Sequence, residues 1–396
     1  MTTRTRRRSA TLRIVRGAIG LVALMAGVAA AEDGGEQDIE FHGFVSQGFL
    51  KSTKNEYLAN STDGSFEFFE AGLNVTKAVS QQLRLGLQLF SRDLGPTGDY
   101  KVLLDWAYLD YRWRDWLGVR AGRIKIPFGL YNDTSDIDAA HPSALLPQSV
   151  YPVENRNFLL AQTGGELYGY RRFEHAGALD YRLYGGTVFL DVPPQPPGSP
   201  IQLLDLQIPY LVGGRVMWET PHEGLRLGVS AQKLRLETEI FDGRDPMMPK
   251  VIEADVPATL VQGSIEYTVD EFVFAAEWSR WYTSVESSDP MAVPEVEQTN
   301  ERAYGLVSYR ATPRLQPSMY YSLFYLDAGK TEGRQSKQHD AAATLRIDIT
   351  ANWLLKLEAH YLRGTGQLSS ALNNNLPLDM LANRWSLFVI KTTAYF

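Results

Sequence analysis

The sequence predicts an all-β protein, a transmembrane antiparallel β-barrel of about sixteen strands with short periplasmic turns, long extracellular loops and a third loop folded into the lumen. Three observations predict this fold. Apolar and polar residues alternate along nearly all of the chain after residue 38, which is typical of strands with one apolar face. The connections between these strands alternate between long and short, as they do in outer-membrane barrels. The N-terminus has the pattern of an export signal.

Residues 1–31 have the features of a secretory signal peptide. They contain six arginines and no acidic residue, followed by the apolar stretch 17–28 and three alanines at 29–31. A basic region, an apolar region too short to span a membrane and a small-residue cleavage site characterise such a signal. We therefore expect residues 1–31 to be removed, 32–38 to form a short lead and 39–396 to form the barrel. Cleavage would remove six positive charges and change the formal net charge from −7 to −13.

The composition excludes several classes of protein. The chain has no cysteine, which rules out disulfide scaffolds, zinc–thiolate sites and a thiol nucleophile. None of the six histidines is spaced two or four residues from another, so the sequence predicts no metal site and no cofactor. An exported chain with this excess of acid gives no indication of a nucleic-acid partner.

The strands are predicted from the alternation, segment by segment. In residues 81–92, for example, leucines at every second position alternate with arginine, glycine and glutamine. Successive side chains of a strand point to opposite faces, so each segment has an apolar face for lipid and a polar face for the interior. The predicted strands span 39–51, 65–79, 81–92, 101–113, 116–126, 159–172, 177–190, 209–220, 223–237, 257–269, 271–284, 301–311, 313–327, 338–350, 352–363 and 383–396.

The connections separate into two sets that alternate along the chain. A soluble β-sandwich has no reason to keep long and short connections at opposite ends, whereas an outer-membrane barrel has long extracellular loops and short periplasmic turns. The short turns are predicted near Ser80, 114–115, 173–176, 221–222, Asp270, Thr312 and Ala351. The long loops are predicted at 52–64, 93–100, 127–158, 191–208, 238–256, 285–300, 328–337 and 364–382.

Charged residues occupy many of the positions predicted to face the interior. A barrel of about sixteen strands is too wide for side chains to fill, so we expect water inside it. For any single charged residue, the simple alternative is a solvated wall residue without a function. The earlier strands contribute the basic residues Arg84, Arg120, Arg123, Lys125, Arg182, Arg215 and Arg226. The later strands contribute the mixed set Glu266, Glu277, Arg346, Asp348, Lys356 and Glu358.

The third long connection, 127–158, is the longest in the chain and contains apolar residues between its turn residues. A loop of this length is functional or disordered as a rule, and its apolar content predicts that it packs inward against the barrel wall. Its acidic residues are Asp133, Asp136, Asp138 and Glu154. Facing the basic wall, they would create a transverse electric field across a narrow aqueous gap. Alternatively the two sets neutralise each other as ion pairs, and both interpretations can hold together.

The segment 119–130, Val-Arg-Ala-Gly-Arg-Ile-Lys-Ile-Pro-Phe-Gly-Leu, leads from a strand into this loop. It resembles the Gram-negative outer-membrane porin superfamily, and most of all its phosphate-selective-porin-like branch. The resemblance implies a sixteen-stranded barrel, usually trimeric, in which the third loop constricts the pore. Phosphate-selective members are expected to have basic loops, whereas the predicted loop 238–256 is mainly acidic. We therefore do not extend phosphate selectivity to this chain.

These observations predict an outer-membrane porin, which forms a water-filled channel for passive diffusion of small hydrophilic solutes or ions. Its expected partners are outer-membrane lipid and lipopolysaccharide, and the resemblance adds a homotrimer. One alternative is an outer-membrane barrel enzyme of the lipase or protease type, with His360 near Glu358 as its base. The sequence has no G-x-S-x-G segment, and we predict no enzyme. The other alternative is an adhesin-like structural barrel that binds through loops such as the proline-rich segment 192–200.

Overall fold

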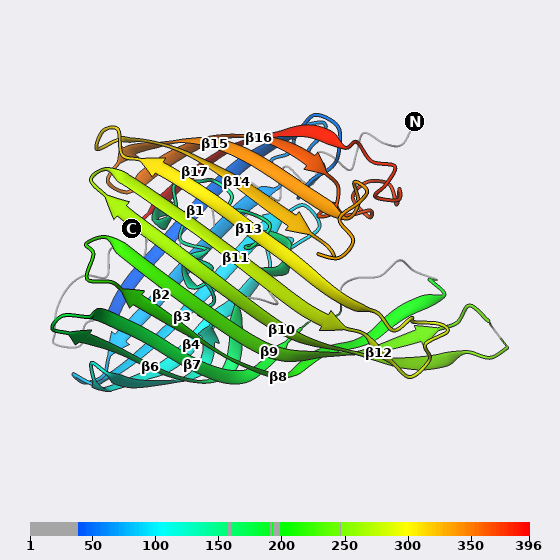
Figure 1. Ribbon diagram of the computed structural model, residues 1–396, viewed down its shortest axis with the longest axis horizontal. Coiled ribbons are helices and arrows are strands. Elements are labelled where there is room, and N and C mark those ends of the chain that lie inside the picture. Colours follow the sequence, from blue (N-terminus) through cyan, green and yellow to red (C-terminus); the bar gives the residue numbers. More distant parts are fainter. Residues whose placement is uncertain (1–38, 157–159, 191, 193–198, 246) are drawn as a thin grey trace.

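The computed structural model describes residues 39–156, 160–190, 192, 199–245 and 247–396. Within them the chain forms a closed antiparallel barrel of sixteen wall strands, as predicted (Figure 1). Each strand pairs with the next one along the chain, and β17 pairs with β1 to close the sheet. The predicted signal peptide (1–31) and lead (32–38) lie outside the described residues.

The wall strands match the predicted segments in number and order. They are β1 (Ile39–Ser52), β2 (Phe68–Ala78), β3 (Leu83–Leu94), β4 (Val102–Arg114), β5 (Leu117–Lys125), β6 (Ala161–Phe173), β7 (Gly177–Phe189), β8 (Ile201–Glu219), β9 (Leu225–Asp242), β10 (Lys250–Val269), β11 (Phe272–Ser284), β13 (Glu297–Tyr309), β14 (Leu315–Tyr325), β15 (Lys337–Thr350), β16 (Trp353–Gly364) and β17 (Arg384–Tyr395). The two-residue strand β12 (Glu286–Ser287) pairs with β10 beside the wall.

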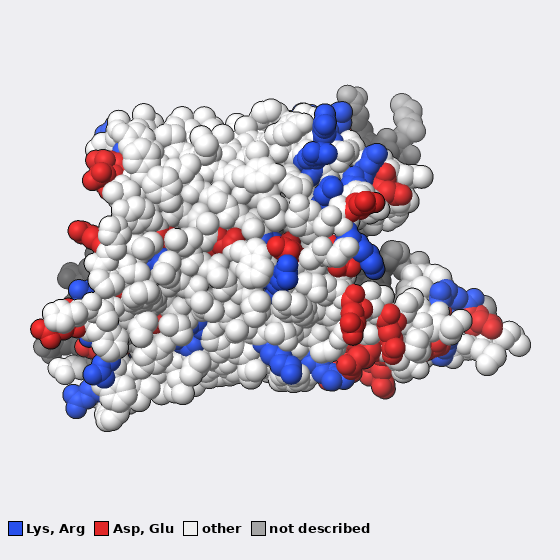
Figure 2. Space-filling model, in the orientation of Figure 1, with Lys and Arg blue, Asp and Glu red and all other residues white. Residues whose placement is uncertain are grey.

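The alternation of residue types places charges inside the barrel and apolar side chains outside. In β16, Lys356 and Glu358 are buried in the interior, while Leu357 between them is 39% exposed on the outer face. This is the reverse of a soluble protein, where charged side chains are seldom buried. In Figure 2, acidic and basic side chains gather at the two ends of the barrel and leave most of the visible wall between them apolar or uncharged.

Three neighbouring strands extend past one predicted end by five residues or more. β8, β9 and β10 continue past the barrel and, with β12, form an arm that projects from one end (Figure 1). The sequence prediction assigned residues 201–208, 238–242 and 250–256 to loops, and that assignment was wrong. Outside the barrel both faces of a strand meet water, so the apolar face that identifies a strand is missing there. Two register shifts in β8, between Leu203 and Asp205 and between Gln207 and Tyr210, disturb the alternation further.

The short turns at the other end need glycine at two positions. Gly177 and Gly224 have φ of +77° and +78°. A Cβ atom at either residue would also lie 1.9 Å from a backbone carbonyl oxygen, that of Glu219 or Thr268. Only glycine combines this left-handed conformation with so close an approach. These turns therefore hold neighbouring strand pairs tightly together at the rim.

Apolar clusters fill part of the interior. One cluster joins β1, β2, β16 and β17 to the loops at the arm end of the barrel, with Leu50, Phe68 and Trp385 from the wall and Tyr57 and Leu145 from the loops. Two further clusters line the β5–β11 wall and the β11–β15 wall. Side chains therefore fill part of the interior, and the prediction of water inside the barrel applies only to the rest. Both the wall strands and the inward loops supply these apolar side chains.

The described part of the chain contains three short 3-10 helices, η1 (Asn132–Thr134), η2 (Asp138–Ala140) and η3 (Val153–Asn155). All three lie in the connection between β5 and β6. No helix in the described part of the chain is long and apolar enough to cross a membrane.

The apolar outer face generates a stability prediction. Leu357→Arg places a charge near the middle of β16 on the outer face, where we expect lipid. The substitution should lower the free energy of unfolding by about 2–4 kcal/mol, measured by urea titration in lipid vesicles. Leu326→Arg is the matched control, because Leu326 lies just beyond the arm-side end of β14 and the cost should fall to about 0–1 kcal/mol there. Equal effects at both positions would contradict a lipid-facing band.

Candidate functional site

The connection that leaves β5 and returns in β6 runs through the barrel interior. Its backbone is held by side chains of the wall: Gly129 N donates to Ser230 Oγ of β9 at 3.0 Å, and Leu130 N donates to Glu277 Oε1 of β11 at 2.9 Å. Farther along, the Ala144 and Leu145 amides donate to Glu358 of β16 at 2.7 and 3.0 Å, and Ser149 Oγ lies 2.7 Å from Ser322 Oγ of β14. Residues 127–156, the described part of the predicted loop 127–158, thus contact strands around most of the barrel. We call residues 127–156 the inner loop.

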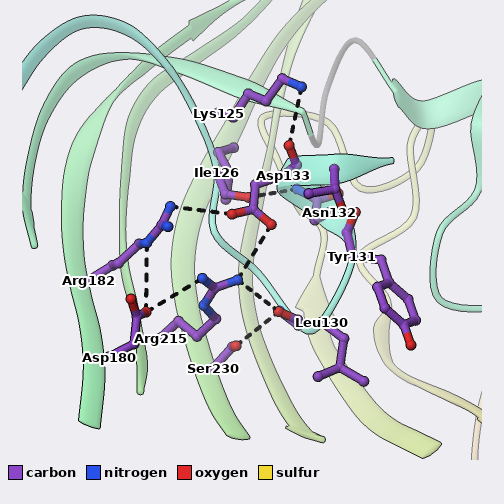
Figure 3. A network of polar contacts seen from close by, with 12 residues as sticks. Lys125, Ile126, Leu130, Tyr131, Asn132, Asp133, Asp180, Arg182, Arg215 and Ser230 are labelled. Carbon is purple, nitrogen blue, oxygen red and sulfur yellow. Dashed lines mark hydrogen bonds and ion pairs between the residues drawn. The ribbon is translucent and has the colours of Figure 1, made fainter. Parts of the chain in front are cut away.

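Asp133 of the inner loop faces two arginines of the wall (Figure 3). Its carboxylate oxygens lie 3.3 Å from Arg182 on β7 and 3.5 Å from Arg215 on β8. Asp180 lies 3.8 and 3.7 Å from the same two guanidinium groups, and the Asp133 carbonyl accepts a hydrogen bond from Lys125 Nζ at 3.2 Å. The Asp133, Asp180 and Arg182 side chains keep 18%, 34% and 21% of their surface exposed. This group of charges is therefore compact but still reachable from the solvent inside the barrel.

Asp136 is buried and pairs with the β3–β5 side of the wall. It contacts Lys125 Nζ at 2.5 Å and Gln88 Nε2 at 2.6 Å, with Arg156 at 3.8 Å. Burial acts to raise the pKa of Asp136, but attraction to Lys125 and Arg156 outweighs it and lowers this pKa to about 2. Arg156 also binds both carboxylate oxygens of Asp105 at 2.8 and 2.9 Å. Asp136 therefore stays charged and anchors the loop.

Asp138 pairs with the last two strands. Its carboxylate lies 2.8 Å from Lys356 on β16 and 3.3 Å from Lys391 on β17, and it accepts a hydrogen bond from Thr393 Oγ1 at 2.6 Å. Lys391 also contacts Glu70 on β2 at 2.9 Å. Burial alone would raise the pKa of Asp138, but the two lysines hold it well below its usual range.

These pairs connect opposite sides of the barrel. In the closed order of the sixteen wall strands, β17 is eight strands from β8 in either direction. Asp133, which pairs with β7 and β8, and Asp138, which pairs with β16 and β17, are only five residues apart in the inner loop. The loop therefore spans the interior as a brace between opposite walls, and it does not lie flat against one of them.

Three predicted wall residues have their polar partners on the wall strands and not in the inner loop. Arg120 on β5 contacts Asp110 at 3.1 Å and Glu166 at 2.9 Å. Arg123 Nε donates to the Asp105 carbonyl at 2.8 Å. Arg226 on β9 lies 2.5 Å from Glu266 on β10 and keeps 45% of its side chain exposed.

Two predicted residues stand apart from the others. Arg84 is exposed near the short-turn end of β3, and Glu154 is exposed in η3. Neither forms an ion pair with another described residue within 4.0 Å. The structure therefore brings Arg120, Arg182 and Arg215 together with acidic partners, but it does not bring Arg84 or Glu154 to the same place.

Arg120 and Lys125 of β5 both form ion pairs inside the barrel, and a glycine with an unusual backbone conformation lies between them. These residues are separated by an odd number of positions, so a regular strand would point them to opposite faces. Gly122 between them has φ of +130°, and a Cβ atom there would lie 2.3 Å from the Ala107 carbonyl oxygen. Gly122 therefore departs from regular strand geometry, while the pairing of β5 with β4 and β6 runs through it without a register shift.

Sequence reasoning missed Lys391 as a partner of the inner loop and Glu70 as a partner of Lys391. The signal was present, because both occupy interior positions in the alternation of β2 and β17. Their proximity depends on the closure of β17 onto β1, which places the last strand two positions from β2, with β1 between them. Residues 321 positions apart in sequence meet in this way.

His360, the candidate base of the enzyme alternative, is enclosed between two carboxylates. Its Nδ1 lies 3.0 Å from Asp340, and its Nε2 lies 2.9 Å from Glu358. The same Glu358 holds the inner-loop backbone. Both ring nitrogens are engaged and the side chain is buried, so this histidine supports the wall and offers no free base to a substrate. No cluster of three or more His, Asp or Glu side chains among the described residues is arranged to bind a metal ion.

Comparison with known proteins shows similarity at the level of the fold. No protein-family model matches the chain, and no curated protein matches it by sequence. Among solved structures, an anion-selective porin from Comamonas acidovorans superimposes with a TM-score of 0.58 at 12% identity, over 91% of this chain and 100% of that one. OmpT, an outer-membrane protein of Vibrio cholerae, superimposes with a TM-score of 0.56 at 11% identity, over 92% of this chain and 99% of that one. The outer-membrane channel DcaP of Acinetobacter baumannii superimposes with a TM-score of 0.51 at 11% identity, over 91% of this chain and 97% of that one. The chain therefore has a porin-type barrel fold.

The buried His141 of the inner loop makes stability depend on pH. Its Nε2 lies 2.8 Å from the Thr134 carbonyl, and burial lowers its pKa to about 4, although that hydrogen bond opposes the shift. The folded protein therefore favours neutral histidine. This contribution is complete above about pH 6.5, and on the order of 3 kcal/mol is lost as the pH falls to about 4. Asp136 and Asp138 titrate below this range.

His141→Gln should remove this slope from the free energy of unfolding, measured by urea titration between pH 7 and 4. His175→Gln is the control, because His175 is exposed in a short turn, and it should leave the slope unchanged. A slope that persists in His141→Gln would place its origin elsewhere.

Proposed function

We propose that this protein is an outer-membrane porin that forms a water-filled channel for passive diffusion of small hydrophilic solutes or ions. The observation that carries the proposal is the inner loop, which spans the barrel interior while one of its acidic groups stays partly exposed beside two wall arginines. A loop that only sealed the barrel would bury these charges completely, because a buried charge is stable only when fully paired. Partial exposure of Asp133 and Arg182 supports an aqueous path between the inner loop and the β7–β8 wall.

The charged residues of the interior divide into two roles in this proposal. Asp136 and Asp138 are buried, so we assign them to holding the inner loop in place. Asp133 faces Arg182 and Arg215, and we assign these three groups to the narrow part of the path. Opposed charges of this kind set a transverse field, which orients polar solutes and disfavours apolar ones. In this proposal Asp133, Arg182 and Arg215 both form ion pairs and create the transverse electric field.

The charges in the narrow part of the path favour weak ion selectivity. Asp133 and Asp180 balance Arg182 and Arg215, so the local formal charge is close to zero. We also propose descent from the phosphate-selective-porin-like branch, supported by segment 119–130. Phosphate itself is not the proposed solute, because dedicated phosphate sites rely on an excess of arginine or lysine.

The alternatives receive less support. A barrel enzyme of the lipase or protease type needs an available base, and both nitrogens of His360 are engaged. An adhesin-like barrel would not need partly exposed charges in its interior. We therefore propose a channel without enzymatic activity, located in the bacterial outer membrane after export.

For its partners we propose lipid and lipopolysaccharide around the apolar outer face, and assembly as a homotrimer. The outer band of apolar side chains supports contact with lipid. One structure of OmpT from Vibrio cholerae, with a TM-score of 0.53, is of a trimer form, which supports the trimer by analogy.

Single-channel recording tests the proposed function directly. Protein purified from the outer membrane of a Gram-negative expression host should give stepwise conductance in planar lipid bilayers, with a small reversal potential in a salt gradient. Hydrolysis of added lipid or peptide without conductance would favour the enzyme alternative. Folded protein that inserts but passes no current would contradict the channel.

Asp133→Asn tests the assignment of the narrow part. The substitution leaves Arg182 and Arg215 without their loop partner, so the reversal potential should move toward anions. The anion-to-cation permeability ratio should rise about two- to fivefold, which corresponds to about 0.5–1 kcal/mol of interaction energy in a water-like dielectric. Glu295→Gln is the matched control, because Glu295 is exposed in the arm region and has the same change of charge. Equal shifts in both variants would mean that Asp133 does not line the path.

A further inference from the structure

Arg302 on β13 is a buried cation that forms no ion pair with any described carboxylate. Its side chain faces the interior and is 6% exposed. Its two terminal nitrogens donate only to neutral oxygens, the Ser149 carbonyl at 3.3 Å and Asn300 Oδ1 at 3.1 Å. By contrast, Arg215 and Lys356, which are equally inaccessible, both lie next to carboxylates. No described carboxylate lies within 4.0 Å of Arg302.

The surroundings of Arg302 are aromatic. The guanidinium carbon lies 3.5 Å from the ring centroid of Trp281 and 5.3 Å from that of Phe324. Such cation–π contacts contribute about 0.5–2 kcal/mol, which is less than the several kcal/mol that burial of an ion costs. Aromatic contact therefore compensates the charge only in part.

Three hydrogen-bond donors of this region have no acceptor among the described residues. They are Arg302 Nε, Trp281 Nε1 and Ser279 Oγ, all buried. Ser279 on β11 is directly paired with Arg302 on β13, and Trp281 is the next interior residue along β11. On the same face of β11, the Glu277 carboxylate is already occupied by Gln262, Ser264 and Tyr304. It is therefore no counterion for Arg302.

We infer that Arg302, Trp281 and Ser279 form a binding site for a small monovalent anion in the interior wall behind the inner loop. A positive charge together with N–H and O–H donors that lack acceptors matches the chemistry of an anion, whose hydrogen bonds to such groups are stronger than those of a neutral acceptor. A water molecule could accept the same hydrogen bonds, but it would leave the charge of Arg302 uncompensated. The shared chemistry fits a halide or the carboxylate of a small solute.

Occupancy of this site would stabilise the inner loop. Arg302 donates to the Ser149 carbonyl, and Ser149 Oγ is hydrogen-bonded to Ser322 Oγ of β14. An anion that holds the guanidinium in place therefore also holds the returning part of the inner loop on the β13–β14 wall. This inference rests on the wall geometry alone and does not depend on the proposed channel.

Thermal unfolding tests the site. The midpoint of the full protein, followed by circular dichroism in detergent, should rise with sodium bromide and saturate when the sodium salt of a bulky sulfonate buffer keeps the ionic strength constant. Arg302→Gln should abolish the rise. Arg310→Gln is the matched control, because Arg310 lies near the other end of the same strand and is paired with Asp348, and it should keep the rise.

A second variant covers the case in which Arg302→Gln does not fold. Trp281→Phe keeps an aromatic ring and removes one N–H, so the half-saturating bromide concentration should increase at least about tenfold, the loss of one hydrogen bond to a charged group. Saturation by acetate at lower concentration than bromide would identify a carboxylate as the ligand, and the reverse order a halide. An unfolding midpoint that does not respond to any anion at constant ionic strength, or that responds equally in wild type and Trp281→Phe, would overturn the inference.

In crystals soaked with bromide, the anomalous signal should appear beside Arg302 Nε. A normally conducting channel without this signal would overturn the anion site alone. A bound bromide in a protein that passes no current would overturn the proposed channel alone.

Discussion

Closure of the sheet is the constraint on which the rest of this structure depends. β1 pairs with β17 over nine residue pairs, from Phe44 with Tyr395 to Ser52 with Leu387. A closed sheet has no free edge in its wall, so the backbone groups of every wall strand find partners in the neighbouring strands. Once the sheet is closed, the two faces of each strand become the inside and the outside of a barrel. Apolar side chains occupy most of the outside, and many charged residues of the wall strands, such as Lys356 and Glu358, lie within.

Confined charges must then be paired or hydrated, and the inner loop provides the pairing. Asp133, Asp136 and Asp138 meet arginines and lysines of the wall, while acidic wall residues accept hydrogen bonds from the loop. Glu277, for example, accepts from the Leu130 amide and from the side chains of Gln262, Ser264 and Tyr304. Glu358 holds the Ala144 amide in the same way. Wall and loop are thus complementary in both directions, and removal of either would leave buried charges uncompensated.

The degree of burial separates structural charges from those that can act on a solute. Asp138 has two lysines and a threonine hydroxyl around it and no access to solvent. Asp133, five residues earlier, keeps part of its surface free beside Arg182 and Arg215. Arg302 differs from both, because it is buried and stacked on Trp281 with no described carboxylate within 4.0 Å. The barrel interior therefore contains charges that hold the inner loop in place, charges that face solvent and a charge without a described counterion. Only the surroundings of each residue distinguish these roles.

The sequence by itself determined the number and order of the wall strands, the side of the wall that most of their residues face, and the long apolar loop, because a two-residue period and a long apolar connection are local properties. It also identified Asp133, Asp136 and Asp138 as the acidic residues of that loop. Only the tertiary structure decided that Asp138 meets Lys391 and that Asp133 meets Arg215, because these contacts depend on closure and on the path of the loop across the interior. The same holds for the projecting arm, where both strand faces meet water and the alternation disappears, and for the two carboxylates that enclose His360. Local periodicity specifies which way a side chain points, but only the closed barrel specifies what it meets there.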